Sequence, residues 1–159
     1  MVDLCQARIA PCIACDGCFT HPRCVVQDDF QGVFDKLLLA DHIVLATPVY
    51  FMGVSAQAKG FIDRCQCLWA RKYIQNLSLP APQGGGDRRG HLISVGGSGG
   101  QTLFQCAEKT FKYFLDTLDA EMGSSLLYRE VDERREIAEH PTAWDDAFSL
   151  GEGLVSPLP

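Results

Sequence analysis

Short apolar runs alternate with amphipathic segments along the chain, and this alternation constrains the fold more than any other feature. The runs at 42–46, 91–95 and 126–131 are typical of buried strands. Segments with apolar residues at helical spacing follow or precede each run. Because such an order places a helix between successive strands, it predicts a parallel β-sheet with helices on both faces, in the α/β class.

Each predicted helix has one apolar face. The first three helices are expected over about residues 30–38, 55–69 and 102–120. Asp28 or Asp29 is placed to cap the first of them. A weaker fourth helix begins near residue 141, and it is expected to bury Trp144, Ala147, Phe148, Leu154 and Val155.

Length and charge narrow the class of protein further. The 159 residues are expected to form a single domain over 1–159. A net charge of −6 argues against nucleic acid or an anionic membrane as a partner, since either would require a basic face. Charged residues interrupt the most apolar region, so no membrane span is predicted. The N-terminus lacks the features of a signal peptide, and a cytoplasmic location is expected.

Four cysteines near the N-terminus have the compact spacing C-x2-C-x2-C-x5-C. They are Cys12, Cys15, Cys18 and Cys24, in a loop over residues 11–24. Bacterial ferredoxins hold iron–sulfur clusters with a similar opening pattern. Zinc, or plain or disulfide-linked thiols, are alternatives, but zinc sites more often divide their ligands into two separated pairs. The spacing therefore favours a cluster and leaves the other two open.

Two loops follow predicted strands at the edge of the sheet where ligands bind in open parallel folds. The first contains a stiffening proline and two aromatic rings: Thr47, Pro48, Val49, Tyr50, Phe51 and Gly53. The second is rich in glycine: Gly96, Gly97, Ser98, Gly99 and Gly100. Its backbone N–H groups can donate to an electron-rich ring edge or to an anion. Each loop alone is also typical of a tight turn, but together they favour a flat cofactor.

These motifs, taken in order, resemble the NADPH-dependent FMN reductase and iron–sulfur flavoprotein family. The resemblance rests on residues 11–18, 24–29, 47–51, 55–59 and 63–64. It implies a flavodoxin-like, three-layer fold and FMN bound by the loops at 47–53 and 96–101. It also implies a [4Fe-4S] cluster on the four cysteines, NADPH or NADH as a possible electron donor, and assembly into homodimers or homotetramers.

The chain departs from the family pattern at its start. Family members begin with a strand, a phosphate-binding loop and a helix, whereas this sequence begins at what corresponds to the second strand, expected over residues 2–9. The first βα unit is therefore expected to be missing, and the domain is expected to be N-terminally truncated. In the flavodoxin-like order 2-1-3-4-5 the missing strand lies inside the sheet, and the cradle for the FMN phosphate is lost with it.

The main functional prediction is an FMN-dependent oxidoreductase that passes electrons between a reduced donor, a [4Fe-4S] cluster and FMN. Its partner would be a redox protein or NAD(P)H. No catalytic side chain is assigned, because cofactors supply this chemistry and the sequence has no Ser–His–Asp or paired-carboxylate signature. A first alternative is an NAD(P)H-dependent FMN or quinone reductase without a cluster. A further alternative is an inactive fragment or a zinc-stabilised interaction module.

Overall fold

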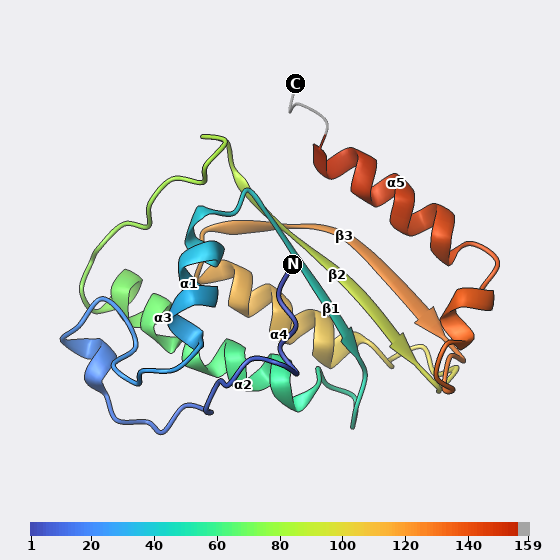
Figure 1. The fold of residues 1–159 in the computed structure, drawn as a ribbon, viewed down its shortest axis with the longest axis horizontal. Coiled ribbons are helices and arrows are strands. Elements are labelled where there is room, and N and C mark those ends of the chain that lie inside the picture. The colour runs from blue at the N-terminus through green and yellow to red at the C-terminus, as the bar shows by residue number, and fades with distance from the viewer. Residues whose placement is uncertain (156–159) are drawn as a thin grey trace.

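Three parallel strands form one sheet in the order β1-β2-β3 in a computed structural model that describes residues 1–155 (Figure 1). The strands are β1 (His42–Pro48), β2 (Arg88–Gly96) and β3 (Ala120–Arg129). The strands predicted from the runs at 42–46, 91–95 and 126–131 are present, but β3 starts earlier than the sequence pattern indicated. Apart from Met122, its first half consists of small or polar residues and is largely exposed, so it lacks the apolar run that marks a buried strand. The last four residues of the domain expected over 1–159 lie outside the described residues.

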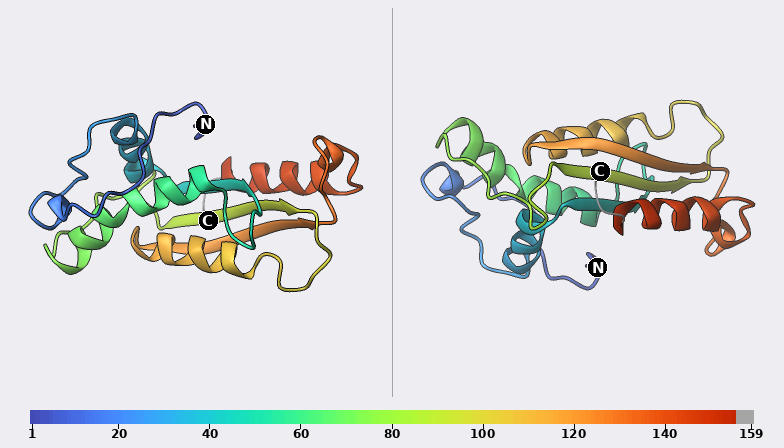
Figure 2. Two further views of the ribbon diagram at one scale, coloured as in Figure 1. Left: turned by 90° about the horizontal axis from the view of Figure 1, so that it is seen from below. Right: turned by 90° about the horizontal axis from the view of Figure 1, so that it is seen from above.

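Helices cover both faces of the sheet. They are α1 (Phe30–Leu39), α2 (Ala56–Arg64), α3 (Gln66–Tyr73), α4 (Gln105–Asp116) and α5 (Ala143–Val155), with short 3-10 helices η1 (Gly17–Phe19) and η2 (Glu136–Glu139). Figure 2 shows α4 and α5 on opposite sides of the strands, which confirms the three-layer α/β prediction. The single helix predicted over 55–69 is interrupted at Cys65. Within residues 1–155, no helix is both long and apolar enough to cross a bilayer.

The main core lies on the face covered by α1 to α4. It is built mostly from aromatic and leucine side chains that are 8% exposed or less: Phe30, Phe34, Phe61, Leu68, Leu92, Phe111, Phe114, Leu115 and Leu118. Burying each such side chain contributes about 1.5–3 kcal/mol relative to leaving it in water. This core fixes α2 and α3 against the sheet, and these two helices carry the residues nearest to the cysteine loop.

The guanidinium of Arg88 connects the first and fourth helices. It donates hydrogen bonds to the carbonyl oxygens of Leu38 and Ala40, at the end of α1, and of Leu118, just after α4. The last carbonyl groups of a helix have no partners within the helix, so a buried arginine can satisfy several of them at once. Arg88 thus positions the carboxyl ends of two helices at the start of β2.

The expected burial of the α5 apolar face is wrong for most of its residues. Ala143 is buried against Tyr128, but Trp144 is 70% exposed and Phe148 is 68% exposed. Ala147 and Val155 are exposed as well. The face is open because, in the part of the chain that the structure describes, α5 packs along β3 and against only the short 3-10 helix η2 (Figure 2).

The strand predicted over residues 2–9 is also wrong. This segment is irregular, and its backbone bonds the start of α1 instead of a strand. The N–H of Arg8 donates to Asp29 Oδ2 at 2.7 Å, and the N–H of Ala10 donates to Asp28 Oδ2 at 2.9 Å. A strand requires a neighbour to pair with its N–H and C=O groups, and within residues 1–155 none lies beside this segment. Asp29 therefore gives no side-chain cap to α1.

Candidate functional site

All four cysteines of the predicted cluster site line one cavity of about 270 Å³. Arg64, Gln66 and Cys67, at the break between α2 and α3, form part of its wall. Pockets for organic ligands usually have volumes of roughly 300–1,000 Å³. This cavity lies at the lower end of that range, and its four cysteine thiols are ligands that suit an inorganic group.

The cysteine loop has an unusual backbone. Ala14 and Asp16 have φ values of 50° and 54°, in the left-handed region that non-glycine residues seldom adopt. A Cβ added at Gly17 would lie 2.8 Å from a methyl group of Val25, so the loop can fold back on itself only with glycine there. Strained backbone of this kind is concentrated at ligand-binding sites, because the surrounding structure has to hold it in place.

Two amide side chains fasten this loop to the helices. Gln75 Nε2, just after α3, donates to the carbonyl oxygens of Cys18 at 3.0 Å and His21 at 2.9 Å. Gln31 Nε2, in α1, donates to the carbonyl oxygen of Cys24 at 2.8 Å. The backbone of the loop is thus bound both to α1 and to the segment after α3. Because these bonds use backbone carbonyl oxygens, the thiols remain available as ligands.

The thiols are free but are not assembled into a coordination sphere. All eight cysteines are unpaired, and among residues 1–155 no three His, Cys, Asp or Glu side chains are gathered closely enough to hold a metal ion. Burial raises the pKa of the Cys18 thiol, although a backbone hydrogen bond acts in the opposite direction. Because metals bind thiolates, the binding of iron here requires the loss of protons and a closer approach of the four sulfurs. The donor set fits a cluster in kind, number and location.

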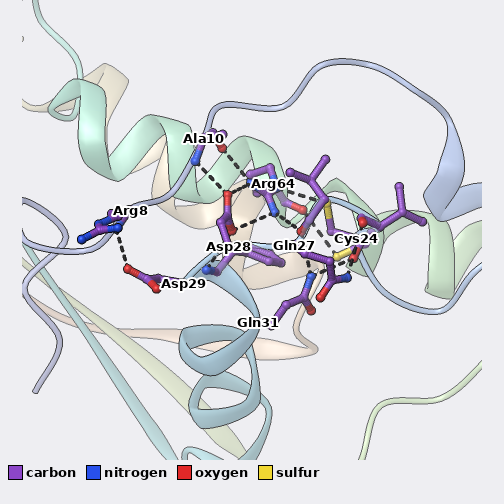
Figure 3. Close-up of polar contacts among 12 residues, drawn as sticks. Arg8, Ala10, Cys24, Gln27, Asp28, Asp29, Gln31 and Arg64 are labelled. Atoms are coloured by element: carbon purple, nitrogen blue, oxygen red, sulfur yellow. Dashed lines mark hydrogen bonds and ion pairs between the residues drawn. The ribbon is translucent and has the colours of Figure 1, made fainter.

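Arg64, the last residue of α2, lies buried beside this cavity (Figure 3). Its Nε donates to Cys24 Sγ at 3.1 Å. Nη1 donates to Asp28 Oδ2 at 2.7 Å and to the carbonyl oxygen of Ala10 at 2.8 Å. Nη2 donates to Asp28 Oδ1 at 3.2 Å and to the carbonyl oxygen of Val26 at 2.9 Å. All five N–H groups of the guanidinium therefore have acceptors.

The pair formed by Arg64 and Asp28 is charged despite its burial. Burial acts against the charged Asp28 carboxylate, but hydrogen bonds from Arg64 and from the N–H groups of Ala10 and Phe30 outweigh it and lower the pKa of Asp28. Burial likewise acts against the charged Arg64, and the bonds to Asp28 and Cys24 more than compensate, so the pKa of Arg64 is raised. A buried positive charge thus lies next to one of the predicted cluster ligands.

The aromatic loop after β1 forms a closed turn. Tyr50 and Gly53 exchange backbone hydrogen bonds, each 3.0 Å long. Phe51 and Met52, between them, have φ values of 49° and 65°, so two consecutive non-glycine residues are left-handed. The ring of Tyr50 is 62% exposed, and Phe51 is fully exposed. The turn therefore presents aromatic rings to solvent at the carboxyl end of β1, where the sequence predicted a flavin contact.

The glycine loop lies directly beside this turn. Pro48 and Val95 are opposite each other in the sheet, and the N–H of Val49 donates to the carbonyl oxygen of Val95 at 2.8 Å. A Cβ added at Gly96 would lie 3.4 Å from Cβ of Val49 and 2.9 Å from Leu103. The structure therefore brings the two predicted loops to one edge of the sheet.

Carboxylates from the segment after β3 border the glycine loop, a feature that the sequence did not predict. A Cβ added at Gly97 would lie 2.6 Å from Asp132 Oδ1, and one at Gly99 would lie 3.2 Å from Glu130 Oε1. The two carboxylates are offset in part by Arg129, whose guanidinium donates to the carbonyl oxygens of Gly100 and Gln101. The remaining excess of negative charge disfavours an anion, so of the two ligands predicted for this loop it favours the ring edge of a cofactor over a phosphate.

α2 connects the two sites. Its first turn is capped by Ser55, whose Oγ accepts from the N–H of Ala58 and whose own N–H donates to Thr47 Oγ1 at 3.0 Å. Its last residue is Arg64, beside the cysteines. Nine residues separate the two ends, so the helix spans roughly 13 Å between the aromatic loop and the cysteine cavity. The predicted cofactor residues thus form two separate sites joined by one rigid element.

The sequence predictions assigned no function to Arg64 or Asp28 beyond their place in the stretches that resemble the family and a possible helix cap at Asp28. A signal for the burial of Arg64 was present, because Arg64 lies three residues after Phe61 and four before Leu68, on the apolar face of the predicted helix. An arginine at such a position is rarely buried without a partner. The pattern indicates a buried ion pair, but it does not identify the partner.

The order of the elements, and the two loops at the carboxyl edge of the sheet, define a flavodoxin-like protein of the α/β class. The chain belongs to the NADPH-dependent FMN reductase family, whose sequence pattern it matches over residues 1–117. Its fold is similar to that of the Trp repressor binding protein of Bacillus subtilis, with a TM-score of 0.55 and 20% identity over 82% of this chain and 78% of that one. The fold and family predicted from the motifs are confirmed.

Two curated relatives are named iron–sulfur flavoproteins. One, from Archaeoglobus fulgidus, is 47% identical over 66 residues, which cover 42% of this chain and 34% of the relative. The other, from Methanosarcina thermophila, is 37% identical over 102 residues, which cover 63% of this chain and 48% of the relative. The chain thus spans less than half of the length of either relative.

Proposed function

We propose that the chain is the FMN- and cluster-binding part of an NAD(P)H-dependent FMN oxidoreductase of the iron–sulfur flavoprotein type. The observation that carries the proposal is the cavity lined by Cys12, Cys15, Cys18 and Cys24. Membership of the FMN reductase family supports the flavin part, and the two relatives named iron–sulfur flavoproteins support the cluster part.

Bound FMN would exchange one or two electrons and a bound [4Fe-4S] cluster would exchange one, which is the chemistry that the two groups supply. The residues of the chain would bind and orient them. Tyr50 would contact the flavin ring, and the backbone of the glycine loop would approach its edge. The four cysteine thiolates would hold the cluster. No side chain needs to transfer a proton in this scheme.

A second candidate is an NAD(P)H-dependent FMN or quinone reductase whose cysteines hold no cluster. The observation that favours it is the lack of an assembled metal-binding group among residues 1–155. In this case the cysteine loop would be structural, because its backbone is already held by Gln31 and Gln75.

The proposal extends to assembly and compartment. Homodimers or homotetramers and a redox partner protein are proposed from the family resemblance. A cytoplasmic location is proposed because eight free thiols are kept reduced most easily in a reducing compartment.

The first experiment is to purify the protein without oxygen and to quantify iron, acid-labile sulfide and flavin in the same sample. About four irons and four sulfides per chain, with FMN, are expected for the main proposal. Flavin with no iron after attempted reconstitution would favour the second candidate. Neither flavin nor iron in a folded sample would contradict both.

Replacing Cys15 with serine tests the ligand assignment. Cys15→Ser should abolish the visible absorbance of the cluster and most of the bound iron, because a hydroxyl is a poor substitute for a thiolate ligand. The matched control is Cys106→Ser, since Cys106 is an exposed thiol in α4 outside the cavity. Iron content that stays the same in Cys15→Ser, or falls equally in both variants, would contradict the assignment.

A further inference from the structure

Among the thiols that line the cysteine cavity, Cys24 is distinguished by a charged partner. Its Sγ accepts a hydrogen bond from Arg64 Nε at 3.1 Å. The Arg64 side chain is fully buried, and its Cζ lies 4.6 Å from the centre of the Phe30 ring. Because water is excluded on this side, the positive charge acts on the sulfur with little screening.

The direction in which the guanidinium points is fixed by Asp28. The Asp28 carboxylate, 14% exposed, binds Nη1 and Nη2, and it is held in turn by the N–H groups of Ala10 and Phe30. With both Nη groups occupied by Asp28 and by carbonyl oxygens, the Nε–H is the donor left for Cys24 (Figure 3). The geometry thus aims one N–H group at one predicted cluster ligand.

We propose that Arg64 is a positioning residue that holds Cys24 as the fourth cluster ligand and makes the cluster easier to reduce. This inference rests on the proposed function, since it requires a cluster. One-electron reduction, by a chemical reductant or a reduced cofactor, adds one negative charge and transfers no atom. A hydrogen bond and a positive charge at a ligand sulfur stabilise that added charge, so the reduction potential rises.

Asp28 affects the potential in the opposite direction. Its negative charge partly cancels the field of Arg64 at the sulfur, and it orients the guanidinium at the same time. Asp28→Asn removes the negative charge and keeps one of the two oxygens that accept from Arg64. The guanidinium keeps its bonds to the carbonyl oxygens of Ala10 and Val26, so a stronger positive field should remain at the cluster. A merely structural pair would behave differently, because loss of either partner would loosen the loop in the same way.

The experiment compares Arg64→Gln, Asp28→Asn and wild type after anaerobic reconstitution, with iron and sulfide quantified in each sample. Reduction potentials are measured by titration with dithionite, followed by visible and electron paramagnetic resonance spectra. We expect the potential of Arg64→Gln to shift to more negative values and that of Asp28→Asn to more positive values. Arg23→Gln is the matched control, because Arg23 adjoins Cys24 in sequence but pairs with Asp35 at the surface. It should leave the potential close to that of wild type.

The outcomes separate the inference from the proposed function. Wild type without iron after reconstitution would overturn both. Wild type with a full cluster, and variants whose potentials are unchanged or move in the same direction, would overturn the Arg64 inference alone. If Arg64→Gln does not fold, the Asp28→Asn arm decides: a positive shift supports the inference, and no shift or a negative one overturns it.

Discussion

Tyr128, at the end of β3, links the sheet to α5 through one hydrogen bond. Its hydroxyl donates to Asp146 Oδ2 at 3.1 Å, and the ring is 7% exposed. Burial, and then the hydrogen bond to Asp146 and its negative charge, raise the pKa of Tyr128 to about 12. The neutral phenol is therefore favoured in the folded protein more than in the unfolded chain.

This shift predicts a loss of stability at high pH. A raised pKa in the folded state gives a contribution that is complete below the unfolded pKa of about 10 and is lost as the pH rises through about 12. We expect Tyr128→Phe to lower the free energy of unfolding by about 1 kcal/mol near neutral pH, and this difference to shrink and then to change sign as the pH rises from about 10 to about 12. Urea unfolding of wild type and Tyr128→Phe between neutral pH and about pH 12 measures this difference in the free energy of unfolding. A difference that stays constant with pH would contradict the prediction.

At the scale of elements, a glycine in the middle of α2 lowers the stability of the helix. Gly60 lies inside this helix, and a Cβ added there meets no atom within 4 Å. Alanine loses less backbone entropy than glycine on folding, so Gly60→Ala should raise the free energy of unfolding by about 0.5–1 kcal/mol. Chemical denaturation provides the measurement.

The control for this substitution is Gly90→Ala in β2. A Cβ at Gly90 would lie 2.3 Å from Leu115 Cδ2, in the core between the sheet and α4. Overpacking of this kind typically costs about 1–3 kcal/mol. The two variants should therefore change stability in opposite directions. If Gly60→Ala destabilised the protein as Gly90→Ala does, the position assigned to Gly60 would be wrong.

The sequence predicted correctly those elements whose apolar side chains pack against another helix or strand. Phe30 and Phe34 mark α1; both are buried, and Phe30 packs against Phe34 and against Phe61 of α2. The place of the two loops at the carboxyl edge of the sheet was also predicted correctly, because each directly follows an apolar strand; their contact with a cofactor stays a prediction. The break at Cys65 was not predicted, since the residues on either side, such as Phe61 and Leu68, continue one apolar stripe.

The tertiary contacts of the cysteine site could not be predicted either. The spacing of the cysteines identified the loop, but the link between Arg64 and Cys24 joins residues 40 apart in the chain. Helical spacing shows that Arg64 lies on an apolar face. The identity of its partner depends on how the loop packs against α2, which a single sequence does not encode in any local pattern.

At the scale of the whole molecule, the two wrong predictions have one cause. The segment 2–9 was expected to be a strand and α5 was expected to be buried, and both need neighbours. Within residues 1–155, no strand pairs with the outer edge of β1, and the helix in contact with α5 is the short 3-10 helix η2. Val44 on this edge is 43% exposed, and Phe148 on α5 is 68% exposed. Local patterns gave the right periodicity for α5, but burial requires a partner.

Exposed apolar surface of this kind predicts self-association of the chain. An unpaired strand edge and a contiguous apolar face both favour contact with another polypeptide. Phe148→Lys should weaken this association about tenfold or more, because burying a phenylalanine contributes about 1.5–3 kcal/mol. Sedimentation velocity over a range of concentrations measures the effect. Tyr113→Lys is the matched control, since Tyr113 is also exposed but lies on α4, across the sheet from α5. If the association persisted in Phe148→Lys and was lost in Tyr113→Lys, the contact would lie on the α4 side, and the open α5 face would have no part in it.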